Sequence, residues 1–534
     1  MTEQQFLQDL EKKLWASANT LRSNISAALY RDVVLGLVFL KYVSDSMDTR
    51  REELRLAFID PENDYYLGED ANEEFIQTEL ETRDYYIEKN VFWVPAEARW
   101  QYIQDNAGLT IGAELPLGGE FKGLDKLLDN TMDIVEKANP KLKNILNKGY
   151  TRLELDPIKL KKLVVEIIST IPFNHDSLDT KDIIGHIYEY FLGKFALEEG
   201  QNGGKFYTPK SIVNLIVEML EPYKGRVYDP AMGSGGFFVS SEKFIEEHSG
   251  RIGDISVYGQ ESDPTTWKLA IMNMVIRGID FDFGKQPRST FTNDQHLDLR
   301  ADFVLANPPF NQDEDDWWDA SLDDDARWKY GTPPKGNANY AWIQHMLHHT
   351  STNGVVGLVL SNGSLSTTTG GEDSIRKAII EADLLEAIVA LPTQLFGNTQ
   401  IPACIWILNR NKSQKDKTLF IDAREAGYMI DRKQRAFDVS DIKAIADTFH
   451  KFRVGTEYED VVGEYYGATT EEIAKQDYIL TPGRYVGVLE EEGDGVPFAE
   501  KMVTLTATLG EQFEQSARLE REIKKNLLGL GYEL

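Results

Sequence analysis

The stretch Val227-Tyr228-Asp229-Pro230-Ala231-Met232-Gly233-Ser234-Gly235-Gly236-Phe237 decides the fold of this 534-residue chain. Its apolar start predicts a short strand that ends at Asp229, and its glycines predict a tight turn into a helix near Phe237. Glycine lets the backbone approach a ligand closely, and the first N–H groups of a helix are free to donate hydrogen bonds. The stretch therefore indicates either a ligand-binding loop in an α/β protein or a tight strand–helix turn that binds nothing.

The residues around the glycines restrict the class of ligand. A dinucleotide-binding G-x-G-x-x-G loop would need glycine at position 238, where this chain has Phe238. A carboxylate at Asp229 would also repel a pyrophosphate, whereas it suits a ligand that carries an ammonium and a sulfonium group. S-adenosylmethionine is such a ligand.

Further short apolar runs alternate with helical patterns from about Thr180 onward, and we expect them to be strands. They are residues 226–228, 256–259, 303–305, 355–360, 385–390 and 403–408. Strands that alternate with helices indicate parallel βαβ units and an α/β sheet with helices on both faces. We expect the core to end near Leu408, where a polar stretch begins.

The two ends of the chain show helical patterns. Apolar residues at spacings of three and four predict a helix over residues 14–29, and further helices are predicted over 123–138 and 158–171. Near the C-terminus, apolar residues occupy a and d positions of a heptad, with polar residues at 512, 516 and 526 between them; they are Met502, Leu505, Leu509, Leu519, Ile523 and Leu530. This seam indicates either a partner-binding helix or a helix packed on its own domain.

Two acidic residues follow the glycine loop at positions suited to an adenosine. The stretch 257–261 is interpreted as the next strand, ending in the carboxylate of Glu261, which can accept hydrogen bonds from ribose hydroxyls, although a surface glutamate is the alternative. Asp294 precedes the strand at 303–305, and we expect it to accept from the adenine amino group of the cofactor.

The stretch Asn307-Pro308-Pro309-Phe310 follows the strand at 303–305. Two prolines stiffen the backbone and remove two N–H donors, so the Asn307 amide oxygen and the Pro308 carbonyl remain as acceptors. Two adjacent acceptors suit an exocyclic amino group whose nitrogen attacks a methyl group. Phe310 offers a face on which a flipped base can stack.

Together these motifs resemble the DNA amino-methyltransferases that modify adenine N6. A preceding F-x-T-P element supports the likeness, and its order before the glycine loop and Asn-Pro-Pro-Phe is that of the gamma group. Four further stretches resemble the modification subunit of type I restriction–modification systems: residues 184–191, 336–342, 391–396 with 401–406, and 480–486.

The resemblance implies a fold and a set of site residues. The fold is a Rossmann-like, seven-stranded methyltransferase sheet, with a helical N-terminal domain (1–170), a methyltransferase domain (171–420) and a C-terminal extension (421–534) that ends in a partner-binding helix. The implied catalytic residues are Asn307, Pro308, Pro309 and Phe310. The residues expected to bind S-adenosylmethionine are Lys205, Phe206, Tyr207, Thr208, Pro209, Lys210, Asp229, Gly233, Ser234, Gly235, Gly236, Glu261 and Asp294.

Composition constrains the partners. With 57 basic and 87 acidic residues, the net charge is −30, whereas a chain that grips DNA alone normally carries a basic face. No segment resembles a target-recognition domain. The resemblance implies that a specificity subunit, shared by two modification subunits, brings the DNA contacts, with a restriction subunit where the system has one.

The sequence is also compatible with three other functions. They are a stand-alone adenine methyltransferase, a glutamine-side-chain methyltransferase, which the F-x-T-P element disfavours, and a non-catalytic structural subunit, which the intact Asn-Pro-Pro-Phe motif disfavours. The single cysteine, Cys404, excludes an internal disulfide, and the chain lacks a signal-peptide pattern, so we expect a cytoplasmic protein.

Four further groups of side chains are not assigned to a functional site: three histidines, one cysteine and two basic clusters. We expect His345, His348 and His349 to lie on a solvated helix face and not to bind a metal, and Cys404 to lie in the core. Two basic clusters, residues 159–162 and 432–435, are as consistent with ordinary surface as with phosphate contacts.

Overall fold

The computed structural model describes residues 6–7, 9–12, 14–15, 27–171, 180–198, 208–248, 254–396, 401–432, 434–488 and 498–529. It contains two compact units, Met1–Val486 and Gly487–Leu534. The boundaries expected near residues 170 and 420 stay predictions, since the first unit spans both positions.

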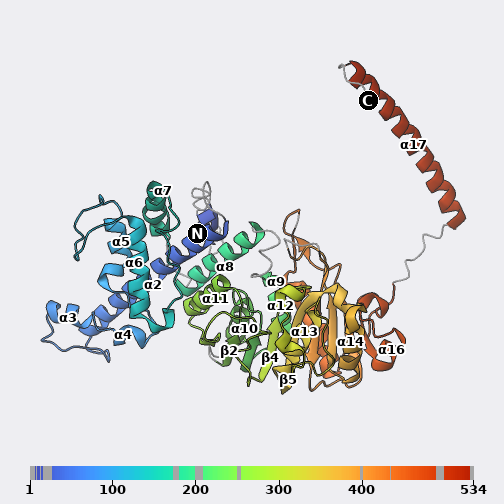
Figure 1. The fold of residues 1–534 in the computed structure, drawn as a ribbon, viewed down its shortest axis with the longest axis horizontal. Coiled ribbons are helices and arrows are strands. Elements are labelled where there is room, and N and C mark those ends of the chain that lie inside the picture. The colour runs from blue at the N-terminus through green and yellow to red at the C-terminus, as the bar shows by residue number, and fades with distance from the viewer. Residues whose placement is uncertain are drawn as a thin grey trace. The chain divides into compact units, whose positions relative to one another are not determined.

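The N-terminal part of the first unit is helical, as predicted (Figure 1). Its helices are α2 (Ala27–Ile59), α3 (Glu73–Glu79), α4 (Asp84–Ile87), α5 (Trp100–Asn106), α6 (Leu124–Ala138) and α7 (Pro157–Lys162), the last continuing through irregular turns to Thr170. Residues 33–40 of α2 are all buried, because α2 packs against α4, α5 and α8 (Thr180–Glu198). Most of the helix predicted over 14–29 lies outside the described residues.

The sheet has the order β11-β8-β6-β7-β5-β4-β1-β2-β3, in which only β7 and β11 run antiparallel to their neighbours. All six predicted strands are confirmed. The strands are β1 (Gly225–Asp229), β2 (Ile255–Gly259), β3 (Phe281–Asp282), β4 (Ala301–Ala306), β5 (Thr350–Ser361), β6 (Leu385–Ala390), β7 (Ala403–Asn409), β8 (Lys417–Asp422) and β11 (Tyr465–Thr469).

Two expectations about the sheet are corrected. It has nine strands instead of seven, because β8 and β11 extend it beyond β6. The core therefore does not end near Leu408. The polar stretch after β7 is only a connection, and it leads into β8, which pairs with β6 in parallel.

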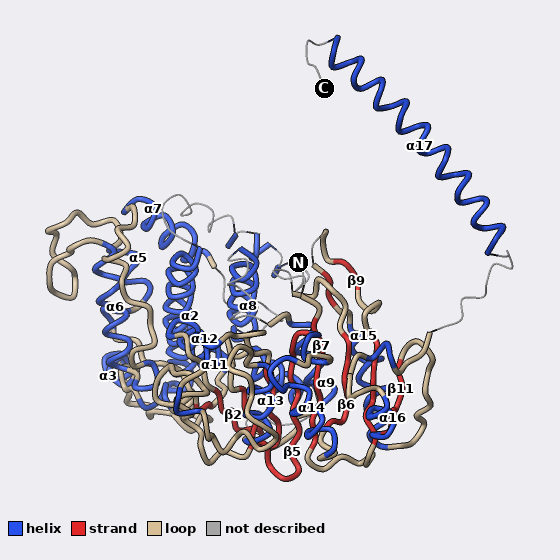
Figure 2. Tube along the Cα trace, turned by 45° about the vertical axis from the view of Figure 1, so that its right-hand side comes forward, coloured by secondary structure: helices blue, strands red, loops and turns tan. Residues whose placement is uncertain are grey.

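Helices cover both faces of the sheet (Figure 2). Successive strand residues point to opposite faces, so Val227 and Leu305 join one apolar cluster while Tyr228 and Val304 join the other. The first cluster includes side chains of α9 (Lys210–Leu220), α10 (Gly236–Glu247), α11 (Pro264–Arg277) and α15 (Val439–Val454); the second includes those of α13 (Asn339–His348), α14 (Glu372–Glu381) and α16 (Thr470–Lys475).

The N-terminal helices dock on the sheet layer through α8 and α11. The Tyr42 hydroxyl of α2 donates to the Ile276 carbonyl at 3.1 Å, and Arg277 pairs with Glu189 of α8 at 2.6 Å. Burial acts to raise the pKa of Glu189, but Arg277 and Lys210 outweigh it and hold that pKa below its usual value.

In its described residues, the second unit contains one helix, α17 (Phe498–Gly529), which confirms the helix predicted near the C-terminus. Within the described residues, no helix combines the length and apolarity needed to cross a membrane.

Candidate active site

The carboxyl ends of β1, β2 and β4 bring the predicted site residues to one edge of the sheet. Asp229 ends β1, Glu261 follows β2, and Asn307 follows β4, with β1 paired in parallel to both of its neighbours. A cavity of about 750 Å³ opens there. Its walls include Pro230, Ala231, Glu261, Thr290, Pro309 and Phe310. Three motifs that are up to 80 residues apart in the sequence thus share one site.

The glycine loop turns tightly between β1 and α10. Gly233 and Gly235 have φ angles of 53° and 81°, which residues with side chains rarely adopt, and Gly235 is the N-cap of α10. A Cβ atom at Gly235 would lie only 3.0 Å from the Met274 methyl group. Ser234 is buried, and its carbonyl accepts from Asn273 at 2.9 Å. The loop is therefore held rigidly by its neighbours, as a ligand cradle requires.

Glu261 is fixed by backbone donors. Its Oε2 accepts from the Gly233 N–H at 3.2 Å, and its Oε1 accepts from those of Ser262 and Asp263 at 2.8 and 2.9 Å. Burial nevertheless raises the pKa of Glu261 to about 7, against the effect of these donors. The carboxylate thus ties the loop after β2 to the glycine loop.

Asp229 is almost fully buried, and its Oδ1 accepts from the Ala231 N–H at 2.9 Å. The pKa of Asp229 lies well above its usual range. Burial is the main cause, and the negative charge of Glu261 raises the pKa further. A cationic ligand between the two carboxylates would relieve this repulsion.

Asn307 has one amide atom satisfied and one unsatisfied. Its Nδ2 donates to the Thr208 hydroxyl at 3.1 Å, which joins the F-x-T-P element to the Asn-Pro-Pro-Phe motif. Its Oδ1 is buried without a hydrogen-bond partner among the residues that the structure describes. Because an unpaired buried acceptor is costly, this atom is suited to a donor that a ligand brings.

The other members of these two motifs have distinct places. Phe310 lines the cavity and meets Phe396 edge to face, with ring centroids 5.9 Å apart. Pro209 precedes the first residue of α9, and the Lys210 ammonium lies 3.1 Å from the Glu189 carboxylate. Lys205, Phe206 and Tyr207 lie outside the described residues.

Asp294 has protein partners on both of its oxygens. Oδ1 accepts from the His296 N–H at 2.9 Å, and Oδ2 lies 2.8 Å from Nε2 of His349. Burial acts to raise the pKa of Asp294, but His349 and the His296 backbone outweigh it, so the pKa is lowered. The role of Asp294 toward adenine stays a prediction, and the cavity walls described above do not include this residue.

The prediction of a solvated histidine face is wrong for His345 and His349, which are fully buried against the sheet. Their ligand atoms and that of Asp294 lie within 4.8 Å of one another, an arrangement that metal sites also show. The Arg327 guanidinium, however, donates to Nδ1 of His345 at 3.1 Å, and its positive charge opposes a cation there. Cys404 is buried in β7, as predicted, and burial raises the pKa of its thiol to about 12.

Sequence reasoning missed several residues that line the cavity. Leu29, Arg31 and Asp32 of α2 reach it from the helical region. Thr290 also lines it and donates to the Pro230 carbonyl at 2.5 Å, while Arg327 holds the carbonyls of Thr290 and Phe291. The cavity residue Trp342 lies in the stretch 336–342, which resembles the type I modification subunit. No sequence motif pointed to the three α2 residues.

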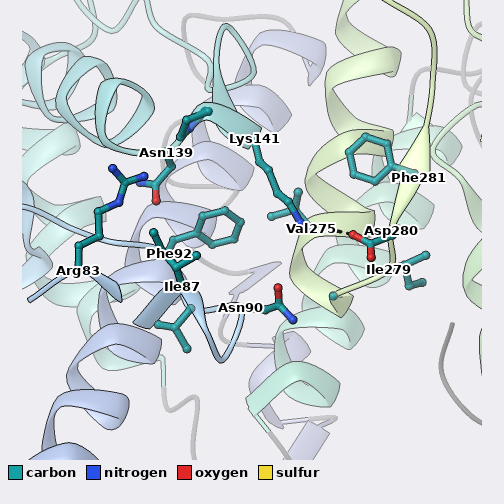
Figure 3. Close-up of a pocket in the computed structure, with 13 residues that line it drawn as sticks. Arg83, Ile87, Asn90, Phe92, Asn139, Lys141, Val275, Ile279, Asp280 and Phe281 are labelled. Carbon is teal, nitrogen blue, oxygen red and sulfur yellow. Dashed lines mark hydrogen bonds and ion pairs between the residues drawn. The ribbon is translucent and has the colours of Figure 1, made fainter. Parts of the chain in front are cut away.

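A second cavity, of about 420 Å³, lies between the helical region and the start of β3 (Figure 3). Its walls include Arg83, Asn139, Ile279 and Phe281, and Lys141 pairs across it with Asp280 at 3.4 Å. None of the predicted site residues that the structure describes lines this cavity, and it lies at the amino end of β3. The cavity at the carboxyl ends is therefore the candidate active site.

Comparison with known proteins identifies the family. Residues 179–494 match the model of the N-6 DNA methylase family, and residues 10–167 match that of the HsdM N-terminal domain. The HindI type I restriction enzyme methylase subunit of Haemophilus influenzae is 58% identical over 82% of this chain and its own full length. The MjaIX methylase subunit of Methanocaldococcus jannaschii is 38% identical over 98% of this chain and 92% of its own.

A solved structure agrees with these relatives. The crystal structure of the type I restriction–modification methyltransferase subunit from Streptococcus thermophilus has a TM-score of 0.72 and 25% identity, and covers 90% of this chain and 99% of that one. The fold, the motifs and the relatives therefore agree: the chain belongs to the N-6 DNA methylase family and, within it, to the methylase subunits of type I restriction enzymes.

Proposed function

We propose that this adenine methyltransferase subunit takes its methyl group from S-adenosylmethionine and delivers it to an adenine that has been flipped out of duplex DNA into the cavity. The observation that carries this proposal is Oδ1 of Asn307, after the carboxyl end of β4, which is buried and has no hydrogen-bond partner among the described residues. This acceptor is close in sequence to Pro309 and Phe310, which line the cavity, and it supports a role in binding the target amino group.

The cavity fits the proposed cofactor. Glu261, in the cavity wall, offers a carboxylate for the ribose hydroxyls, and Pro230 and Ala231 bring the start of the glycine loop to the same wall. Asp229 and Glu261 supply negative charge for an ammonium and a sulfonium group, and the pKa of each carboxyl group is raised without such a partner. The sulfonium supplies an activated methyl group when the cofactor is bound.

The chain's own residues would prepare the nucleophile. Asn307 Oδ1 and the Pro308 carbonyl accept hydrogen bonds from the adenine amino group, draw its nitrogen toward tetrahedral geometry and localise its lone pair. Phe310, positioned by Phe396, stacks on the flipped base. Positioning of this kind, with polar groups fixed in advance, supplies much of the rate enhancement.

The proposed working form is a complex. We infer that two copies of this chain share one specificity subunit, which supplies base contacts and phosphate-neutralising residues, and that a restriction subunit joins where the system has one. Apolar side chains of α17, including Leu505 and Ile523, are more than half exposed, which suits a helix that docks on a partner. Double-stranded DNA binds through this complex.

Replacing Asn307 by alanine tests the proposal. Methyl transfer by the assembled complex should fall by about a hundredfold or more, because the amino group loses its acceptor. The Kd for S-adenosylmethionine, measured by titration calorimetry, should stay within about threefold, because Asn307 is proposed to contact the base.

Asn147→Ala is the matched control, since Asn147 also has a buried, unpartnered amide atom but lies in the helical region. It should leave transfer unchanged. Wild-type methylation by Asn307→Ala would contradict the proposed role of this residue. If the wild type did not bind S-adenosylmethionine, a structural subunit would be favoured. Site-specific methylation by the chain alone would favour a stand-alone enzyme.

A further inference from the structure

One surface element is left unexplained by the proposed function: the hairpin formed by residues 423–436, which contains β9 (Tyr428–Met429) and β10 (Arg435–Ala436). Tyr428, Met429 and Ile430 are 41–55% exposed, and Arg432 beside them is exposed as well. In sequence, the hairpin has four basic and two acidic residues, within a chain of net charge −30. It combines apolar and basic side chains on one exposed element.

The hairpin lies on the catalytic edge of the sheet. It follows β8 directly, and β8 runs parallel to β6, so its carboxyl end is on the same edge as Asn307. In Figure 2, β9 projects from the sheet beyond the strand ends. Four strand spacings separate β8 from β4, a distance of about 19 Å.

Backbone hydrogen bonds connect the hairpin to β6 and to the segment that follows it. The Ala423 N–H donates to the Ala390 carbonyl at 3.0 Å, and the Arg435 N–H donates to the Gln394 carbonyl at 2.9 Å. Two residues after Gln394, Phe396 contacts Phe310. The hairpin thus has a defined position relative to the residue proposed to hold the flipped base.

We propose that the β9–β10 hairpin binds the target duplex beside the flipped adenine, with Arg432 against a backbone phosphate and Met429 in the groove. This proposal rests on the proposed function, because a base can enter the cavity only if its duplex lies along this edge. A separation of about 19 Å corresponds to five or six base-pair steps, and the major groove admits a two-stranded ribbon. The basic charge of the hairpin complements a polyanion, whereas most of the chain repels it.

The test compares Arg432→Gln with Lys224→Gln in the full chain assembled with its specificity subunit. Lys224 is also exposed, but it precedes β1 and therefore lies at the opposite edge of the sheet. Fluorescence anisotropy with a duplex that carries the target site measures Kd at several salt concentrations. Loss of one phosphate contact should reduce the slope of log Kd against log salt by about 0.9 for Arg432→Gln and leave it unchanged for Lys224→Gln.

Two further variants sharpen the comparison. Arg432→Lys keeps the charge and should restore the wild-type slope, while Met429→Ser should weaken binding several-fold with an unchanged slope. Equal slopes for wild type and Arg432→Gln would overturn the proposal. Loss of assembly by Arg432→Gln in size-exclusion chromatography, with an unchanged slope, would show a protein contact and would also overturn it.

The proposed function can fail separately. If the wild-type complex binds the duplex without methylating adenine, the proposed chemistry fails, yet the salt slopes still decide whether the hairpin contacts DNA.

Discussion

At the scale of single residues, the site is dominated by two carboxyl groups that burial makes reluctant to ionise. Asp229 ends β1 and Glu261 follows the neighbouring strand β2, and burial is the largest cause of the raised pKa of each. A cation placed between them would lower both pKa values, because it favours the charged form of each group. The two carboxyl groups therefore ionise most readily when an ammonium or sulfonium group is present.

The pKa of Glu261 predicts how cofactor affinity depends on pH. Since its pKa is about 7, its carboxylate is mostly protonated at pH 6 and mostly ionised at pH 8. If the carboxylate accepts from ribose hydroxyls, the Kd for S-adenosylmethionine should improve about tenfold between these values. Calorimetric titrations of the wild type at both pH values measure this change.

Glu261→Ala supplies the comparison for that measurement. It should raise the Kd about ten- to a hundredfold at pH 8, because a charge-assisted hydrogen bond is lost. Any titration of the cofactor itself persists in this variant, so the difference between the two pH profiles belongs to Glu261. A variant with the wild-type Kd would show that another acid binds the ribose.

At the scale of elements, β2 and the loops beside it form one packed block under the cavity. The Gln260 N–H donates to the Asp229 carbonyl at 3.1 Å, and the Met232 N–H donates to the Gln260 carbonyl at 3.2 Å. Gln260 is fully buried, and its side chain holds the Asn293 carbonyl at 2.7 Å and the Gln295 N–H at 3.0 Å. The position of the cofactor loop therefore depends on the packing of β2.

Gly259→Ala should disturb this block. A Cβ atom there would lie 2.5 Å from the Met232 sulfur and 3.0 Å from the Phe283 ring, so the Met232 side chain, the glycine loop or β2 must shift. We expect the free energy of unfolding to fall by about 1–3 kcal/mol in urea denaturation, and cofactor affinity to fall with it. Gly336→Ala is the control, because a Cβ there meets no atom within 4 Å. Equal stability of the two variants would contradict the expected clash.

At the scale of the whole molecule, charge sets the need for partners. With a net charge of −30, the isolated chain meets a polyanion, and at physiological salt repulsion persists over a Debye length of about 8 Å. The basic β9–β10 hairpin reduces this repulsion only at the edge of the sheet where the parallel strands have their carboxyl ends. We therefore expect the purified chain to bind duplex DNA weakly and without sequence preference.

Deleting residues 502–534 tests the proposed docking helix. Cofactor binding should remain, because the active site lies within the unit Met1–Val486. Assembly with the specificity subunit should be lost, since the exposed apolar side chains of α17 are removed. Size-exclusion chromatography of the mixed subunits measures assembly, and normal assembly by the truncated chain would exclude α17 as the docking element.

Much of the α/β architecture could be predicted because its signals are local. A strand that ends at an acid, followed by a glycine turn, specifies β1 and α10 within a dozen residues, and the same holds for Glu261 after β2 and Asn307 after β4. The rule that open α/β sheets bind ligands at their carboxyl ends then places these three residues together. The sequence alone therefore predicts that these three residues lie at one edge of the sheet, and their strands end at that edge.

Other features depend on contacts between distant segments. Helical spacing puts His345 of α13 and His349, its C-cap, on one face, but packing against Tyr228 of β1 helps to bury that face. Likewise, Arg31 of α2 reaches the cavity through the docking of the helical region, and β11 joins the sheet only by pairing with β8. Local pattern decides which residues share a strand end or a helix face. Long-range packing decides what that face meets, because burial and pairing depend on segments that are far apart along the chain.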